Sequence, residues 1–211
     1  MSVVGKQVYV KNDGTGIDDA LKATDKFASS LDFTGKKAMH LRLLAEEMLG
    51  MVRAITGEFT ALCWAEGDEN EVRLNLMADT EMNPEKRREL ISTSTSKKNK
   101  AARGFMGKIK ELIEIGMENY DEVSRLQVKY GVDPVSYGSM GMGVDNEIMA
   151  QAALSWSLEN YRKSLSGSKN EGEGYVEAWD ELEKSIVANL ADDVQVGIRN
   201  DKVEIVVIKK F

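Results

Sequence analysis

The feature that most constrains the fold of this chain is an apolar helix followed by two alternating strands. Residues 41–51 carry apolar side chains at helical spacing around an acidic pair, Glu46 and Glu47. In residues 72–78, Val, Leu, Leu and Ala alternate with Arg, Asn and Met, which is typical of a strand with one buried and one partly open face. We therefore expect this helix to pack on a sheet.

Periodicity predicts five strands and three helices around this centre. The expected strands span 6–11, 59–65, 72–78, 193–199 and 202–209, and the helices span 17–31, 36–55 and 178–190. Polar turns at 12–16 and 66–70 separate them. This order predicts an α+β fold: a two-layer sandwich in which helices cover one face of a mostly antiparallel mixed sheet.

Residues 84–177 interrupt the pattern. Up to Gly174 they contain no run with the character of a strand. The pattern predicts helices at 99–127 and 146–165, followed by a Ser, Gly and Glu linker at 166–174. Because 211 residues suit one domain, we expect a single domain over 1–211 with a long helical insertion at 84–177.

Charge and composition argue against several classes of function. The net charge of −7 disfavours nonspecific binding to nucleic acid or to an anionic membrane. The single histidine, His40, leaves no multi-histidine metal site. The single cysteine, Cys63, excludes an internal disulfide, and we expect a buried thiol because it lies in an apolar strand. With neither a signal peptide nor a run of roughly 18 apolar residues, we expect a cytoplasmic protein.

The pattern Leu-x-Leu-x-x-x-Glu at Leu41, Leu43 and Glu47, followed by a strand pair that ends at Asp79, resembles the GHKL superfamily. These are the Bergerat-fold ATPases of histidine kinases, gyrase and heat-shock chaperones, and the anti-sigma-factor serine kinases are the nearest group. The resemblance covers about residues 6–83 and 178–211. The insertion at 84–177 corresponds in position to the family's ATP lid.

The resemblance implies roles for particular residues. Glu47 matches the glutamate that positions the attacking water or hydroxyl, but Met51 stands where the family has an asparagine that holds magnesium. A methionine thioether is a poor ligand for this hard cation, which prefers oxygen. Asp79 matches the aspartate that bonds the adenine amino group, while Glu81 and Asn83 replace the two glycines that follow it in the family.

A glycine-rich run stands where the family has its glycine-rich lid. Gly138, Gly141 and Gly143 precede an expected helix, so their backbone N–H groups could bind phosphate. A loop that caps the following helix is the alternative. The similar run at 13–17 lies before the glutamate helix, and we interpret it as a turn and a helix cap.

The acidic pair also has a structural interpretation. Leu43, Leu44, Met48 and Met51 could form the packed face of their helix, which would leave Glu46 in solvent and Glu47 at the edge of that face.

The replaced residues predict a degenerate histidine-kinase-like module that binds a regulatory protein partner, as the anti-sigma relatives do, with no cofactor and no metal. One alternative is an active serine kinase or ATPase that binds ATP or ADP in an unorthodox pocket lacking its magnesium ligand. Another is a helical interaction protein whose function resides in the insertion. We expect neither nucleic acid nor membrane as a partner, and the oligomeric state stays open.

Overall fold

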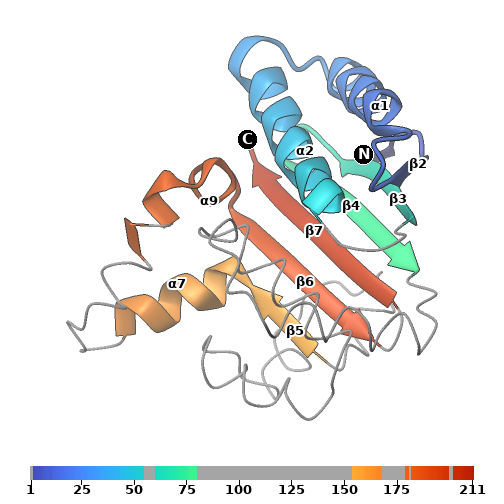
Figure 1. Cartoon of the computed structure of the whole chain (residues 1–211). Helices are drawn as coiled ribbons and strands as arrows, with labels where there is room; N and C mark the ends of the chain where they lie inside the picture. The colour runs from blue at the N-terminus through green and yellow to red at the C-terminus, as the bar shows by residue number, and fades with distance from the viewer. Residues whose placement is uncertain (1, 55–59, 80–153, 168–178, 181, 200–201) are drawn as a thin grey trace, which may run out of the picture.

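A computed structural model describes residues 2–54, 60–79, 154–167, 179–180, 182–199 and 202–211 (Figure 1). The fold is α+β, with a sheet of seven strands. The strands are β1 (Val3–Val4), β2 (Val8–Lys11), β3 (Thr60–Gly67), β4 (Glu71–Asp79), β5 (Leu154–Ser157), β6 (Asp193–Arg199) and β7 (Lys202–Lys210). The helices are α1 (Ile17–Ser30), α2 (Gly35–Ala54), α7 (Leu158–Gly167) and α9 (Ile186–Leu190).

The last strand of the chain lies inside the sheet. The order is β1-β3-β4-β7-β6-β5, and β2 pairs with β3 on the same edge as β1. β7 pairs with the whole of β4 on one side and with β6 on the other. Every strand pair in the described residues is antiparallel, so the parallel pairing expected of a mixed sheet is not found among them.

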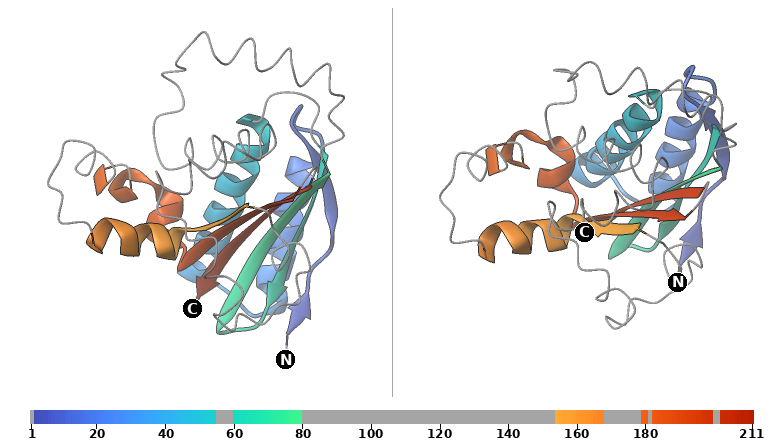
Figure 2. Two further views of the ribbon diagram at one scale, coloured as in Figure 1. Left: turned by 90° about the horizontal axis from the view of Figure 1, so that it is seen from below. Right: turned by 60° about the horizontal axis from the view of Figure 1, so that its bottom comes forward.

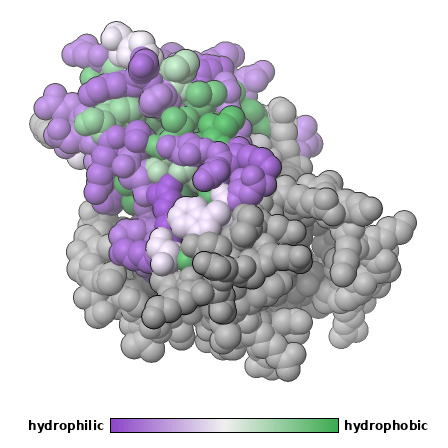
Figure 3. Space-filling view, turned by 90° about the vertical axis from the view of Figure 1, so that its left-hand side faces the viewer, coloured by the Kyte–Doolittle hydropathy of each residue, from purple (hydrophilic) through white to green (hydrophobic). Residues whose placement is uncertain are grey.

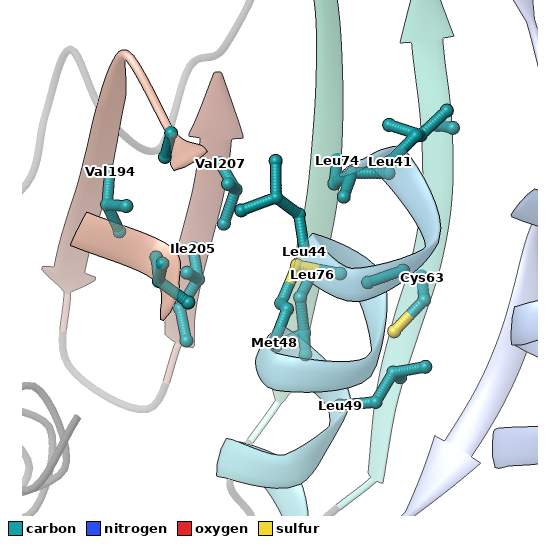
Figure 4. Packing of buried hydrophobic residues seen from close by; sticks show 14 of the residues in the cluster. Leu41, Leu44, Met48, Leu49, Cys63, Leu74, Leu76, Val194, Ile205 and Val207 are labelled. Carbon is teal, nitrogen blue, oxygen red and sulfur yellow. The ribbon is translucent and has the colours of Figure 1, made fainter. Parts of the chain in front are cut away.

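Helices α1 and α2 contact one face of this sheet (Figures 1 and 2). α2 crosses β4 and β7, and its core side chains meet those of the strands below it (Figure 4). The buried residues of α2 are Leu41, Leu44, Ala45, Met48 and Leu49. Each large apolar side chain contributes roughly 1.5–3 kcal/mol on full burial. Two of the residues expected on the packed face of this helix, Leu44 and Met48, are buried, whereas Leu43 is only half-buried.

The opposite face of the sheet has a buried centre with polar side chains. Asn75 is 1% exposed and Glu204 is 0% exposed. Asn75 pairs with the buried Val206, which in turn pairs with the buried Gln195. The expectation of a partly open face on β4 holds for the half-buried Met77 and is wrong for Asn75. Alternation identifies the face of a residue but not what covers it.

The expectation of no strand in residues 84–174 is wrong at β5, which pairs with β6. Within the range 146–165, where a helix is expected, residues 154–157 form a strand instead. The helix α7 follows it from Leu158. Trp156 pairs across from Val196 and is 3% exposed, with its ring 6.0 Å from that of Tyr161. Burial of this indole in the sheet outweighs the helical pattern. The helix at 99–127, the start of the 146–165 helix and the glycine run lie outside the described residues.

The helix expected at 178–190 is interrupted. Residues 179–180 and 182–184 are helical, but Ser185 is extended, with φ −83° and ψ 123°. Its side chain accepts a hydrogen bond from the backbone N–H of Ala188, at 3.2 Å, and so caps α9. A serine within a helical pattern here begins a second helix, because its hydroxyl satisfies a free N–H group of the first turn.

The strand expected at 6–11 is shorter than predicted, and a separate short strand precedes it. Val4 pairs with Glu66, Gly5 donates to the Ala65 carbonyl, and Val8 pairs with Cys63. Lys6 and Gln7 therefore lie opposite the single residue Trp64, which is a β-bulge. The strand expected at 6–11 is β2, which begins after the bulge, and β1 continues the same edge before it.

Candidate functional site

The acidic pair on α2 divides between two environments. Glu46 is exposed, and its Oε1 accepts a hydrogen bond from Arg42 Nε at 2.9 Å. Arg42 also forms an ion pair with Asp25 of α1. Glu46 thus belongs to the contact between two helices, which agrees with the expectation that it lies outside the packed face.

Glu47 lies at the edge of the packed face. It is half-buried and precedes the core residue Met48. Among the described residues, no hydrogen bond or ion pair engages its carboxylate. Met51 follows one turn later on the same helix, so positions 47 and 51 belong to one side of α2. Position 51, where the GHKL resemblance implies a magnesium ligand, carries a methionine.

The end of β4 is the second part of the predicted site. Ala78 is 0% exposed and lies in a cross-strand row with Ala61 and Val203. This row continues the face covered by α2. Asp79 lies in the next row, where its backbone pairs with Thr60 and Lys202. Because neighbouring residues of a strand belong to opposite faces, the row on the α2 side ends with a methyl group at Ala78.

The predicted site residues are brought together only in part. α2 and β4 run in the same direction (Figure 1). Asp79 is the last residue of β4, and Glu47 lies in the second half of α2. Gly138, Gly141 and Gly143 lie outside the described residues. The roles of all five residues stay predictions.

A small cavity lies between α1, α2 and the bulged edge of the sheet. Gly5, Thr24, Met48 and Cys63 are among the residues that line it. The centre of a water molecule could move within only about 10 Å³ of this cavity, so the cavity holds one water at most. Pockets for small ligands are larger, about 300–1,000 Å³. This cavity is therefore a gap in the core packing and not a nucleotide site.

Cys63 faces this core as a free thiol, 4% exposed. Burial raises the pKa of the Cys63 thiol to about 12. Since the thiolate is the nucleophile, this cysteine is inert at neutral pH, as the sequence predicted.

Asp193 carries a buried carboxylate that accepts hydrogen bonds at both oxygens, a role that its sequence context did not predict. Its Oδ1 accepts hydrogen bonds from the backbone N–H groups of Glu159 and Val194, both at 2.9 Å. Its Oδ2 accepts one from Gln195 Nε2 at 3.1 Å. Burial raises the pKa of Asp193, and these hydrogen bonds offset part of the rise. Because Glu159 is in the first turn of α7, Asp193 fixes the start of that helix to β6.

Metal ligands and membrane-spanning helices also bear on function. In the part of the chain that the structure describes, no three His, Cys, Asp or Glu side chains are grouped so that they could hold a metal ion. No helix there is long and apolar enough to cross a membrane.

Comparison with known proteins returns no relative: no family model matches the chain, nor does any curated protein or solved structure. The likeness to the GHKL superfamily accordingly rests on the motif residues of the sequence.

Proposed function

We propose that this chain is a degenerate histidine-kinase-like module of the cytoplasm that no longer turns over ATP and acts by binding a regulatory protein partner. One observation carries this proposal most directly. Under α2, the row of β4 ends at the fully buried Ala78, where a methyl group offers no acceptor for an adenine amino group. Position 51 on α2 adds a second loss, because its methionine replaces the magnesium ligand.

The charge of the region supports the same conclusion. Glu47 already lies on α2, and Glu81 follows shortly after β4 in sequence. Nucleotide phosphates would add further negative charge, and like charges in a partly dry site repel strongly unless a cation intervenes. Without its magnesium ligand, such a site favours an uncharged ligand over ATP.

The partner-binding half of the proposal assigns the recruiting surface to the insertion. Its test must keep β5, because this strand belongs to the sheet. Leu154 pairs with Ile198, next to the Arg199–Lys202 pair, and Lys202 pairs with Asp79. Residues 79 and 154 are thus three strand spacings apart, roughly 14 Å. A linker of about eight residues spans this gap.

The experiment replaces residues 80–153 with such a Gly/Ser linker and compares this variant with the full chain. Both proteins are used to capture partners from the cells that make the chain, and captured proteins are identified by mass spectrometry. We expect the variant to keep the circular dichroism spectrum of the sheet and to lose a partner that the full chain retains. A folded variant that captures the same proteins would place the recruiting surface elsewhere. Release of phosphate from ATP by the full chain, abolished in Glu47→Gln, would favour the active kinase or ATPase instead.

A further inference from the structure

The bulged edge of the sheet carries the two most exposed of the large apolar side chains in the described residues. Val4 is 63% exposed and Tyr9 is 70% exposed. The other two, Met39 and Ile186, stand on different helices. The side of the molecule away from this edge is mostly hydrophilic in its described part, with hydrophobic side chains towards its upper part (Figure 3).

The bulge brings Val4 and Tyr9 onto one face. In a regular strand, two residues five positions apart point to opposite faces. The extra residue at Lys6–Gln7 shifts the alternation, so that Val4 pairs with Glu66 and Tyr9 pairs with Leu62. Both pairs belong to the face opposite α1 and α2. Bulges at sheet edges commonly re-aim side chains in this way.

Half-buried apolar residues extend this surface inward. Leu62 lies between Tyr9 and Met77 in one cross-strand row, and Trp64 lies two residues further along β3 on the same face. Leu62, Trp64 and Met77 are all half-buried. Directly paired residues have Cβ atoms about 4.5–5.5 Å apart, so these side chains form one continuous surface. We name it the edge patch; its members are Val4, Tyr9, Leu62, Trp64 and Met77.

The two charged side chains on the outer edge of the sheet, residues 2–11, are the lysines Lys6 and Lys11, although the chain as a whole carries −7. Acidic side chains lie further in at Glu66 and in the turn after β2 at Asp13. Lys6 and Lys11 are exposed on the same edge, and neither belongs to an ion pair in the described part of the chain. Glu66 is engaged by the indole N–H of Trp64, at 3.2 Å, and Arg73 pairs with Glu71 at 3.1 Å. Lys6 and Lys11 form the outer rim of the patch because they lie on the outermost edge of the sheet, whereas Glu66 lies inside it on β3 and keeps its negative charge.

From these observations we infer that the edge patch binds an acidic segment of another protein, which lays aromatic or aliphatic side chains on Tyr9 and Trp64 and carboxylates beside Lys6 and Lys11. Aromatic residues that are partly exposed in a patch commonly dominate binding energy, and rim charges select the partner. The inference goes beyond the proposed function, because it adds a second protein-binding surface that does not involve the insertion.

Edge protection and self-association fit the edge patch less well. Lysines and bulges do protect sheet edges from unwanted pairing, but protection does not require an exposed tyrosine and valine on the same face. In a symmetric contact with a second copy, the same positively charged rim would be present on both partners, and like charges disfavour that contact.

The test uses the full chain and a displayed library of peptides about ten residues long, in which apolar residues alternate with either acidic or basic residues. We expect acidic peptides to be enriched. Tyr9→Ser and Lys6→Glu should each weaken their binding roughly tenfold or more, whereas the matched surface change Met39→Ser should not alter it. Thermal melting of each variant checks that the fold is retained. We expect it to be retained because all three substituted side chains are exposed.

Several outcomes would overturn the inference. These are no enriched peptide, equal enrichment of basic peptides, and binding that Tyr9→Ser leaves unchanged. A dimer of the chain that Tyr9→Ser dissociates, measured by sedimentation, would identify a second copy as the occupant and also contradict it. Each of these results leaves the capture experiment with the 80–153 replacement unaffected, so the failure of the patch and the failure of the proposed function can be told apart.

Discussion

Gly67 has a backbone conformation that other residues rarely adopt. Its φ is +140°, and an added Cβ would lie 2.1 Å from the Glu71 carbonyl oxygen across the β3–β4 hairpin. Gly67→Ala should lower the free energy of unfolding by roughly 1–3 kcal/mol. Gly50→Ala is the matched control, because a Cβ there meets no atom within 4 Å inside α2, and it should raise that free energy by about 0.5–1 kcal/mol. Urea unfolding measures both, and equal effects would contradict the hairpin geometry.

Cys63 should make stability depend on alkaline pH. Burial raises its pKa from 9.0 to about 12, so the unfolded chain loses the thiol proton first as the pH rises. The contribution of Cys63 is therefore fully present below pH 9.0 and is lost towards pH 12, by up to about 1.4 kcal/mol per pH unit. Since Cys63→Ala cannot titrate, the difference in unfolding free energy between wild type and this variant should shift in favour of the variant above pH 9.0. A difference that stays constant with pH would show that the thiol is accessible to water.

At the scale of elements, the carboxylate of Asp193 contributes to the attachment of α7 to β6. Asp193→Ala leaves the backbone N–H groups of Glu159 and Val194 without their acceptor, which should cost roughly 1–3 kcal/mol. Asp193→Asn keeps an acceptor oxygen and should cost less. Chemical unfolding compares the two variants. Equal losses would mean that the carboxylate charge, and not its acceptor role, holds α7.

Asp193→Asn and wild type also give a test against pH. Because the pKa of Asp193 is raised, its contribution is fully present below its ordinary value of about 4 and is lost as the pH rises through the raised pKa. The stability of Asp193→Asn relative to wild type should therefore improve as the pH rises from about 3 towards neutrality. A relative stability that worsens over this range would contradict the direction of the shift.

How far the sequence predicts an element depends on where its partners lie in the chain. β6 and β7 are predictable because alternating residues flank the turn at 200–201, and the two strands are neighbours in sequence. β5 has only four residues, and its partner β6 begins at Asp193, 36 positions after the end of β5 at Ser157. Nothing within Leu154–Ser157 indicates that pairing, because it arises from tertiary contacts. The position of Ala78 under α2, in contrast, follows from the alternation with Leu74 and Leu76 and could have been read from the sequence.

For the whole molecule, β7 is the element on which the sheet depends. Val203, Ile205 and Val207 are at most 1% exposed, and burying each contributes roughly 1.5–3 kcal/mol. Deleting residues 200–211 should therefore leave insoluble or unfolded protein, because total stability is about 5–15 kcal/mol. Deleting Phe211 alone removes a ring contact with Phe33 at 4.6 Å and should only lower the melting temperature. A soluble 1–199 fragment with an unchanged melting temperature would contradict the central place of β7.

The central claim is that the pocket implied by the GHKL resemblance no longer binds magnesium-ATP. Isothermal titration of the full chain with ATP, with and without magnesium, tests it directly, and Asp79→Asn serves as the control. We predict no binding at micromolar concentrations in either condition, and adenosine tolerated better than ATP, because Met51 offers magnesium no oxygen and Ala78 ends the row under α2. Micromolar affinity for magnesium-ATP that disappears in Asp79→Asn would contradict this claim and establish a working nucleotide site.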